Sequence, residues 1–116
     1  MHFLFILNDS PHATQGPYNG LRLAVSLARS SNNKVRVFLL GDGVICGLAG
    51  LNPSDASYNV QELFKQLTQR DVPIGVCRTC MEQRGVPDTM LIEGARRSTM
   101  DELTAWTEEA DKILVF

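Results

Sequence analysis

The stretch FLFIL, residues Phe3–Leu7, is apolar at every one of its positions. A strand with one face in water alternates apolar and polar side chains, whereas a strand buried on both faces of a sheet is apolar throughout. We therefore predict that Phe3–Leu7 is a strand with both faces buried. Such strands are typical of parallel sheets, in which helices cover the two faces.

Amphipathic and apolar segments alternate behind this first strand. Asn59 and Thr99 each precede a glutamate by three residues, which is the spacing of a helix cap and its reciprocal partner. Further elements follow from periodicity and turn residues. The predicted elements are strand Phe3–Leu7, helix Tyr18–Ser30, strand Val35–Leu40, a short helical turn Val44–Ala49, a helix behind Asn59, strand Pro73–Val76, a short helix Arg78–Gln83, a helix behind Thr99 and strand Ile113–Phe116.

The segment Asp88–Ser98 is the weakest part of this pattern. The alternation requires a fourth strand there, but Arg96 and Arg97 fit a buried strand badly. We expect this strand to be the least accurate prediction.

Alternating strands and helices require crossover connections, which place parallel strands in one sheet. The predicted fold class is α/β, with three α/β/α layers around a mostly parallel sheet of five strands. A length of 116 residues without a linker predicts one domain over residues 1–116.

The composition excludes several classes of protein. Apolar residues make up 44% of the chain and charged residues 21%, which is typical of a globular protein and not of a disordered or coiled-coil chain. The net charge of −2 provides no overall attraction for nucleic acid or anionic lipid. No apolar run approaches the length of a membrane span or a signal peptide, so we expect a cytoplasmic protein.

In parallel sheets, functional sites form beyond the carboxyl ends of the strands. Three loops are expected to leave those ends, namely Asn8–Asn19, Gly41–Tyr58 and Cys77–Pro87. We predict that the site lies where these loops meet.

The sequence Cys77-Arg78-Thr79-Cys80 is the sharpest chemical signal. Cys77 is expected where a strand ends and a helix begins, and free backbone N–H groups there stabilise a thiolate. With Arg78 and Arg84 nearby, we expect Cys77 to be the most reactive thiol, with a pKa below that of free cysteine.

Four interpretations of this pair remain open. The two cysteines could be inert packed residues, a dithiol–disulfide redox pair, part of a zinc site, or a site where Cys77 alone carries persulfide sulfur. Zinc needs four ligands, and only Cys46, His2 and His12 could add any, without the usual spacing. We therefore predict no metal and no cofactor.

The glycine-rich segment Gly41–Gly47 resembles a phosphate loop but misses the dinucleotide fingerprint by one residue. A tight turn with close packing is the simpler interpretation. Asp42 could hold a backbone N–H or a partner side chain there, and Cys46 is expected to be a buried, small apolar residue. His12 lies in a polar loop and is either plain surface or a participant in the site.

Four sequence segments together resemble the DsrE/DsrF-like family, closest to its YchN-like branch, over essentially the whole chain. The specific parts are the cysteine segment and the end of the chain. The segments are GDGV (Gly41–Val44), YNVQ (Tyr58–Gln61), VCRTCMEQRG (Val76–Gly85) and ELTAWTEEADKILVF (Glu102–Phe116).

This resemblance implies a five-stranded parallel α/β/α fold and homo-oligomers, typically trimers or hexamers. Relay members of the family carry persulfide sulfur on one cysteine at the end of strand three, with an Arg-Gly pair shortly downstream. Cys77 with Arg84-Gly85 occupies that place. Cys80 has no counterpart in those single-cysteine relays, although YchN-like members have it, and it would assist or discharge the persulfide.

We therefore expect a small sulfur-relay protein that exchanges sulfur with donor and acceptor proteins through Cys77, with Cys80 as second site residue. If it is an enzyme, it resembles a sulfurtransferase. The alternatives are a redox protein that uses Cys77 and Cys80, and a non-catalytic oligomer that binds a small molecule. Persulfide transfer needs Cys77 alone, redox chemistry needs both cysteines, and binding needs neither.

Overall fold

The computed structural model describes residues 1–51 and 59–116. Residues 52–58, which belong to the predicted loop Gly41–Tyr58, therefore lie outside the described part. The elements in chain order are β1 (His2–Leu7), α1 (Gly16–Ala28), β2 (Lys34–Leu39), the 3₁₀ helix η1 (Gly41–Gly47), α2 (Val60–Thr68), β3 (Ile74–Cys77), α3 (Arg78–Gln83), the 3₁₀ turn η3 (Asp88–Met90), β4 (Ala95–Ser98), α4 (Met100–Glu109) and β5 (Lys112–Val115).

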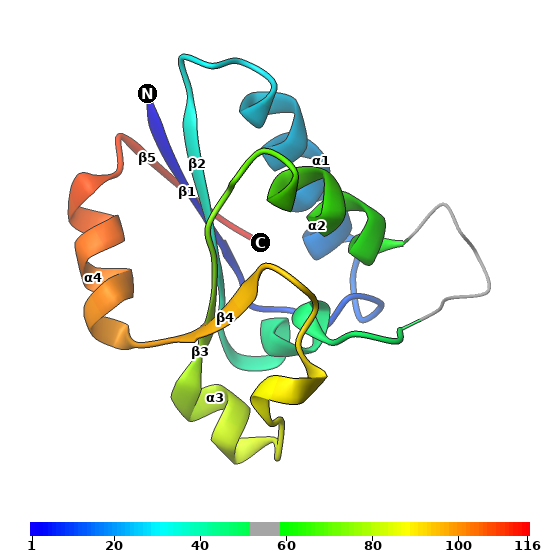
Figure 1. The fold of residues 1–116 in the computed structure, drawn as a ribbon. Coiled ribbons are helices and arrows are strands. Elements are labelled where there is room, and N and C mark those ends of the chain that lie inside the picture. The colour runs from blue at the N-terminus through cyan, green and yellow to red at the C-terminus, as the bar shows by residue number, and fades with distance from the viewer. Residues whose placement is uncertain (52–58) are drawn as a thin grey trace.

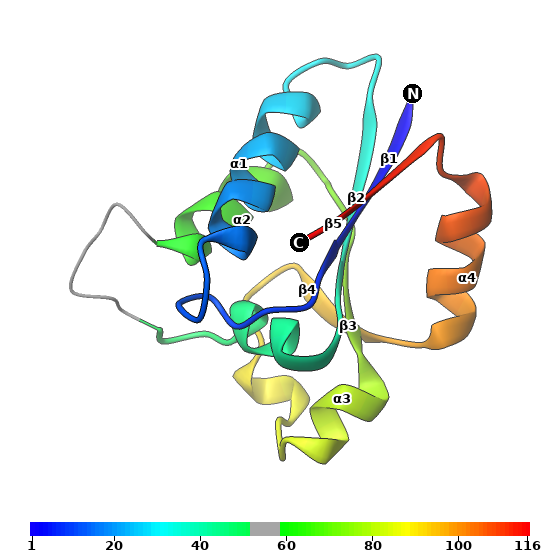
Figure 2. The ribbon, with the colours of Figure 1, turned by 180° about the vertical axis from the view of Figure 1, so that it is seen from behind.

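The five strands form one parallel sheet in the order β4-β3-β2-β1-β5. Helices α1 and α2 cover one face of the sheet and α4 covers the other (Figure 1). Seen from behind, α3, η1 and η3 gather at the carboxyl end of β2 and β3 (Figure 2). The predicted α/β class, with a five-stranded parallel sheet and helices on both faces, is confirmed.

The boundaries of several elements differ from the predicted ones. Helix α1 begins at Gly16, with Pro17 in its first turn, where a proline loses no hydrogen bond. The helical turn expected from Val44 begins already at Gly41, so the glycine-rich turn is itself the first turn of η1. The last strand begins at Lys112, one residue early.

Strand β4 exists within the predicted segment, and its arginines are explained by its place in the sheet. It is an edge strand that pairs only with β3, and Arg96 and Arg97 are exposed. Arg97 donates to Asp88 at 2.8 Å, and Arg96 pairs with Glu102 at 2.7 Å. An edge strand tolerates charges that a central strand would exclude.

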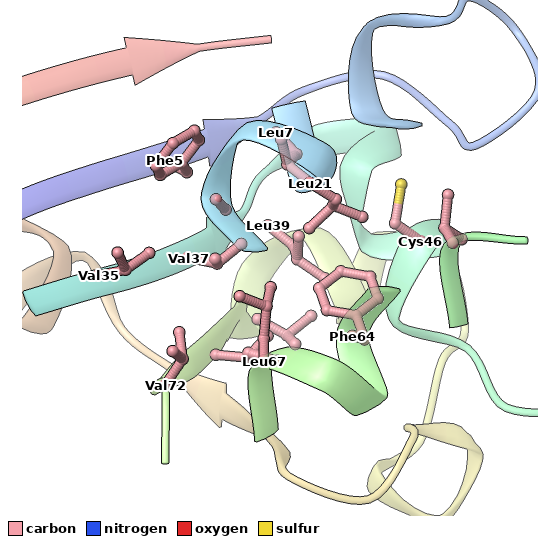
Figure 3. Close-up of a cluster of buried hydrophobic side chains, with 14 of the residues drawn as sticks. Phe5, Leu7, Leu21, Val35, Val37, Leu39, Cys46, Phe64, Leu67 and Val72 are labelled. Atoms are coloured by element: carbon pink, nitrogen blue, oxygen red, sulfur yellow. The ribbon is translucent and has the colours of Figure 1, made fainter. Parts of the chain in front are cut away.

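The main hydrophobic core lies between the sheet and the helices α1 and α2. Phe5 of β1, Leu21 of α1 and Phe64 of α2 are fully buried in it. Figure 3 shows Phe5, Leu21 and Phe64 spread along this cluster, with Cys46 at its margin.

A smaller core lies on the opposite face, beneath α4. It consists of Leu4, Phe38, Cys77, Leu103 and Trp106. The rings of Phe38 and Trp106 meet edge to face, with their centroids 6.0 Å apart.

The carboxyl ends of β1 and β2 are joined by close backbone contacts. The Gly43 N–H donates to the Asn8 carbonyl at 3.1 Å. A Cβ atom at Gly43 would lie 1.9 Å from the Leu7 carbonyl oxygen, so only glycine fits there. The tight turn with close packing, which was the simpler interpretation of this segment, is thus observed. Across the described residues, none of the helices has both the length and the apolar character of a membrane span.

Candidate functional site

Cys77 is the last residue of β3 and the N-cap of α3. All four residues of β3 are buried, and Cys77 itself is 6% exposed. Its Sγ accepts a hydrogen bond from the Cys80 backbone N–H at 3.4 Å. The predicted strand end and the predicted helix Arg78–Gln83 are both present, so the cysteine stands at the strand-to-helix junction as expected.

Cys80 lies one helical turn further along α3 and is half-buried. Its sulfur accepts a hydrogen bond from the Gly41 N–H at 3.2 Å. Gly41 has a φ of +54°, in the left-handed region that glycine adopts without strain. The start of η1 therefore presents a backbone donor to the second cysteine, a contact that the sequence analysis missed.

An ion pair ties the same loop to α3. Arg84 donates to Asp42 Oδ1 through Nη2 at 2.9 Å and through Nε at 3.1 Å. Its Nη1 also donates to the Cys80 carbonyl at 3.2 Å. Of the two roles considered for Asp42, the structure shows the side-chain partner. The result is a clamp, formed by Asp42 and Arg84, that holds Gly41 against α3.

The two cysteines open into a pocket of about 560 Å³ between α3 and the β4–α4 junction. Of the three loops expected to meet at the site, only Cys77–Pro87 contributes lining residues among those that the structure describes. The described part of the loop Gly41–Tyr58 reaches the site through the Gly41 N–H on Cys80. The loop Asn8–Asn19 is not among the lining residues. It contacts η1 instead, through the Gly43 N–H on Asn8. The lining residues are Leu40, Cys77, Arg78, Thr79, Cys80, Ser98, Thr99, Met100 and Asp101.

The wall formed by β4 and α4 was also missed by the sequence analysis. Ser98 is buried and donates to Glu102 at 2.6 Å. Hydrogen bonds from Arg96 and then Ser98 hold the pKa of Glu102 below its ordinary value, so this carboxylate stays charged and paired. Thr99 caps α4 by accepting the Glu102 N–H at 3.2 Å, as its spacing predicted.

The expected lowering of the Cys77 pKa is wrong. Burial raises the pKa of Cys77 above its ordinary value and outweighs the N–H groups of Cys80 and Thr79, which act in the opposite direction. A hydrogen bond to the Cys80 side chain and the charge of Cys80 raise the Cys77 pKa further. Burial of Cys77 therefore favours the protonated form of its thiol.

The positive charge expected beside Cys77 is largely compensated. Arg78 is exposed and lies 3.8 Å from Glu82, one turn along α3. Arg84 points its guanidinium at Asp42 rather than at a sulfur. Neither arginine acts on Cys77 as an unpaired cation.

Cys46 lies outside the pocket, and its predicted burial is confirmed. It is fully buried, and its Sγ–H donates to the Asp9 carbonyl at 3.3 Å. Burial raises the pKa of the Cys46 thiol to about 12. His12 is exposed, and within residues 1–51 and 59–116 no three potential ligands among His, Cys, Asp and Glu are grouped to hold a metal ion.

Comparison with known proteins places this chain in a family. A model of the DsrE/DsrF-like family matches residues 1–116. Protein YchN of Escherichia coli is 39% identical over 97% of both chains. The crystal structure of the E. coli ychN protein covers all of both chains, with a TM-score of 0.90.

Two more distant relatives are also similar over almost the whole chain, and the name of one of them refers to sulfur transfer. A sulfurtransferase TusD homologue of Haemophilus influenzae is 23% identical and covers 98% of both chains. A protein TusC homologue of Aliivibrio fischeri is 27% identical, over 97% of this chain and 96% of the relative.

Proposed function

This chain belongs to the DsrE/DsrF-like family, and from that premise we propose that it works in a sulfur relay and carries persulfide sulfur on Cys77. In this role the Cys77 thiol first loses its proton to water, and the resulting thiolate attacks the outer sulfur of a donor persulfide. A new S–S bond forms on Cys77, the donor's S–S bond breaks, and the donor leaves as a thiolate. Residues 1–116 act as one domain in the cytoplasm, where thiols stay reduced.

One observation carries the proposal: the Cys77 sulfur ends a strand of the sheet and opens into the pocket between α3 and the β4–α4 junction. The pocket gives a bound sulfur atom space beyond Sγ. The Cys80 N–H, at 3.4 Å from Cys77 Sγ, supplies a donor for the sulfur. The name of the TusD homologue supports the same chemistry.

Sulfur loading of single-cysteine variants tests this function. After incubation with one equivalent of glutathione persulfide, intact mass spectrometry should find one added sulfur atom on Cys80→Ser, removable by dithiothreitol. Cys77→Ser should gain none. Cys46→Ser is the matched control, because it removes a thiol outside the pocket and should behave as the unaltered protein. A sulfur adduct that persists in Cys77→Ser would overturn the assignment.

Dithiol–disulfide exchange is the second candidate function. It is favoured by one observation, the hydrogen bond of 3.4 Å from the Cys80 N–H to Cys77 Sγ, which places the two cysteines together on one helical turn. If an oxidant forms the Cys77–Cys80 disulfide and no variant accepts sulfur, dithiol–disulfide exchange is the better account of the function. If neither an adduct nor a disulfide forms, a non-catalytic binding role is the better account.

The relay also needs partners, and we propose that the chain assembles with copies of itself as a trimer or hexamer and exchanges sulfur with donor and acceptor proteins. In support, β5 exposes Ile113 and Val115, which are 43% and 59% accessible. Apolar side chains exposed side by side on an edge strand are typical of an interface. Light scattering at micromolar concentration should find an oligomer, and a monomer would contradict this part of the proposal.

A further inference from the structure

We propose that Cys80 is the resolving thiol of this site: it attacks the persulfide on Cys77, closes a Cys77–Cys80 disulfide and releases the carried sulfur as hydrosulfide. This inference rests on the proposed function and adds a second reaction to it. The first reaction needs only Cys77, whereas the second needs both cysteines and an external dithiol that reduces the disulfide afterwards.

The backbone places the two sulfur atoms within bonding reach. Residues three apart on a helix have Cβ atoms about 5–6 Å apart, and a disulfide draws its Cβ atoms somewhat closer, to about 3.5–4.5 Å. Cys77 is the N-cap of a short helix and Cys80 is its third residue. Cys77 Sγ already accepts the Cys80 N–H at 3.4 Å. Closing the bond therefore needs only a local adjustment.

The surroundings of the two cysteines differ in a way that assigns their roles. Cys77 is 6% exposed, while Cys80 is half-buried and accepts the Gly41 N–H at 3.2 Å. A backbone donor on sulfur stabilises the thiolate, which is the attacking form in disulfide chemistry. Cys80 is thus equipped to attack and Cys77 to be attacked.

The clamp formed by Asp42 and Arg84 keeps the Gly41 N–H beside Cys80. Arg84 binds Asp42 on the loop side and the Cys80 carbonyl on the helix side. Arg84 therefore connects Asp42, which follows Gly41 in the chain, to Cys80, whose sulfur accepts the Gly41 N–H. Gly41, Asp42 and Arg84 act through Cys80 and are positioning residues.

The reaction balances as a two-electron exchange. Cys80 enters as a thiolate, having lost its proton to water, and forms a bond to Cys77 Sγ. The bond between Cys77 Sγ and the outer sulfur breaks, and the outer sulfur leaves with the bonding pair and its own proton as HS⁻. The sulfane sulfur is reduced to sulfide while the two cysteines are oxidised to a disulfide. An external dithiol then restores both thiols and is itself oxidised.

The test follows mass and released sulfide after addition of one equivalent of glutathione persulfide without a reductant. The unaltered protein and Cys46→Ser should release one hydrosulfide per chain and lose two hydrogen atoms in mass, with Cys77 and Cys80 joined. Cys80→Ser and Cys80→Ala should keep the added sulfur and release at least tenfold less sulfide over the same time.

Each other outcome has a distinct meaning. Sulfide release from the Cys80 variants at the normal rate would overturn the resolving role but leave the proposed function intact. A glutathione adduct instead of an added sulfur on the Cys80 variants would also overturn it, because the disulfide would then arise without a persulfide. Failure of the Cys80 variants to accept any sulfur would overturn the proposed function itself.

Discussion

The two faces of the sheet bury their cysteines differently. On the face of α1 and α2, two helices enclose a large core with Cys46 at its margin, fully buried and hydrogen-bonded to a carbonyl. On the face of α4, a single helix covers a small core that includes Cys77, and a pocket reaches the sulfur. The thickness of the covering layer therefore separates the fully buried thiol of η1 from the thiol at the end of β3, which lines a pocket.

The largest expected effect on this comparison comes from truncating matched leucines on the two faces. Leu67 of α2 is fully buried and Leu103 of α4 is 7% exposed. Leu→Ala in a core costs about 2–5 kcal/mol, more where the surroundings cannot collapse. Urea unfolding should place Leu67→Ala near the top of that range and Leu103→Ala near the bottom. Equal losses of the free energy of unfolding would show that the two faces contribute alike.

Alkaline pH should reveal the burial of Cys46 as a loss of stability. Its pKa is about 12 in the folded protein and near its ordinary 9.0 when unfolded. Between these values the unfolded chain releases a proton that the folded chain keeps, so the free energy of unfolding falls as pH rises. The contribution of Cys46 approaches about 1.4 kcal/mol for each pH unit.

Cys46→Ser isolates this contribution, because serine keeps a donor for the Asp9 carbonyl and does not ionise in this range. Urea unfolding between pH 8 and roughly 11 should give a shallower decline for the variant than for the unaltered protein. Parallel declines would mean that the Cys46 thiolate is solvated in the folded state.

The smallest expected effect concerns the Gly41 N–H, the backbone donor to the sulfur of Cys80. Gly41→Ala and Gly85→Ala both place an alanine at positive φ, +54° and +65°, with space for the Cβ atom. Each should cost about 1–2 kcal/mol of stability. Alanine keeps the backbone N–H, but its strain at positive φ should move that N–H away from Cys80 Sγ, so Gly41→Ala should slow alkylation of Cys80 and Gly85→Ala should not. Iodoacetamide labelling followed by peptide mass spectrometry measures both rates, and equal rates in the two variants would show that the donor has no effect.

The sequence predicted most of the architecture because its patterns are local. The apolar run Phe3–Leu7, the cap at Thr99 and the strand-to-helix junction at Cys77 each depend on neighbouring residues, and each is observed. The order of strands in the sheet is not local. Arg96 and Arg97 looked misplaced until β4 proved to be an edge strand.

The site was predicted only in part, because some of its contacts are local in the sequence and others join distant residues. Cys77 and Cys80 share one helical turn, so their proximity follows from their spacing. The Gly41 donor comes from a residue 39 positions away, and the pocket wall at Ser98 comes from the neighbouring strand. The direction of the Cys77 pKa was wrong because burial depends on tertiary packing, which the strand-to-helix junction alone does not reveal.

The pairing of β1 with β5 has a consequence for the time course of folding. These strands neighbour each other in the sheet although α1, β2, β3 and β4 all separate them in the chain. During synthesis, β1 can pair with β2 early and β3 can then add to the far edge of β2, but the other edge of β1 stays open until β5 leaves the ribosome. Contacts between distant segments slow folding, so β5 is expected to dock last, on a nucleus of β1, β2 and α1.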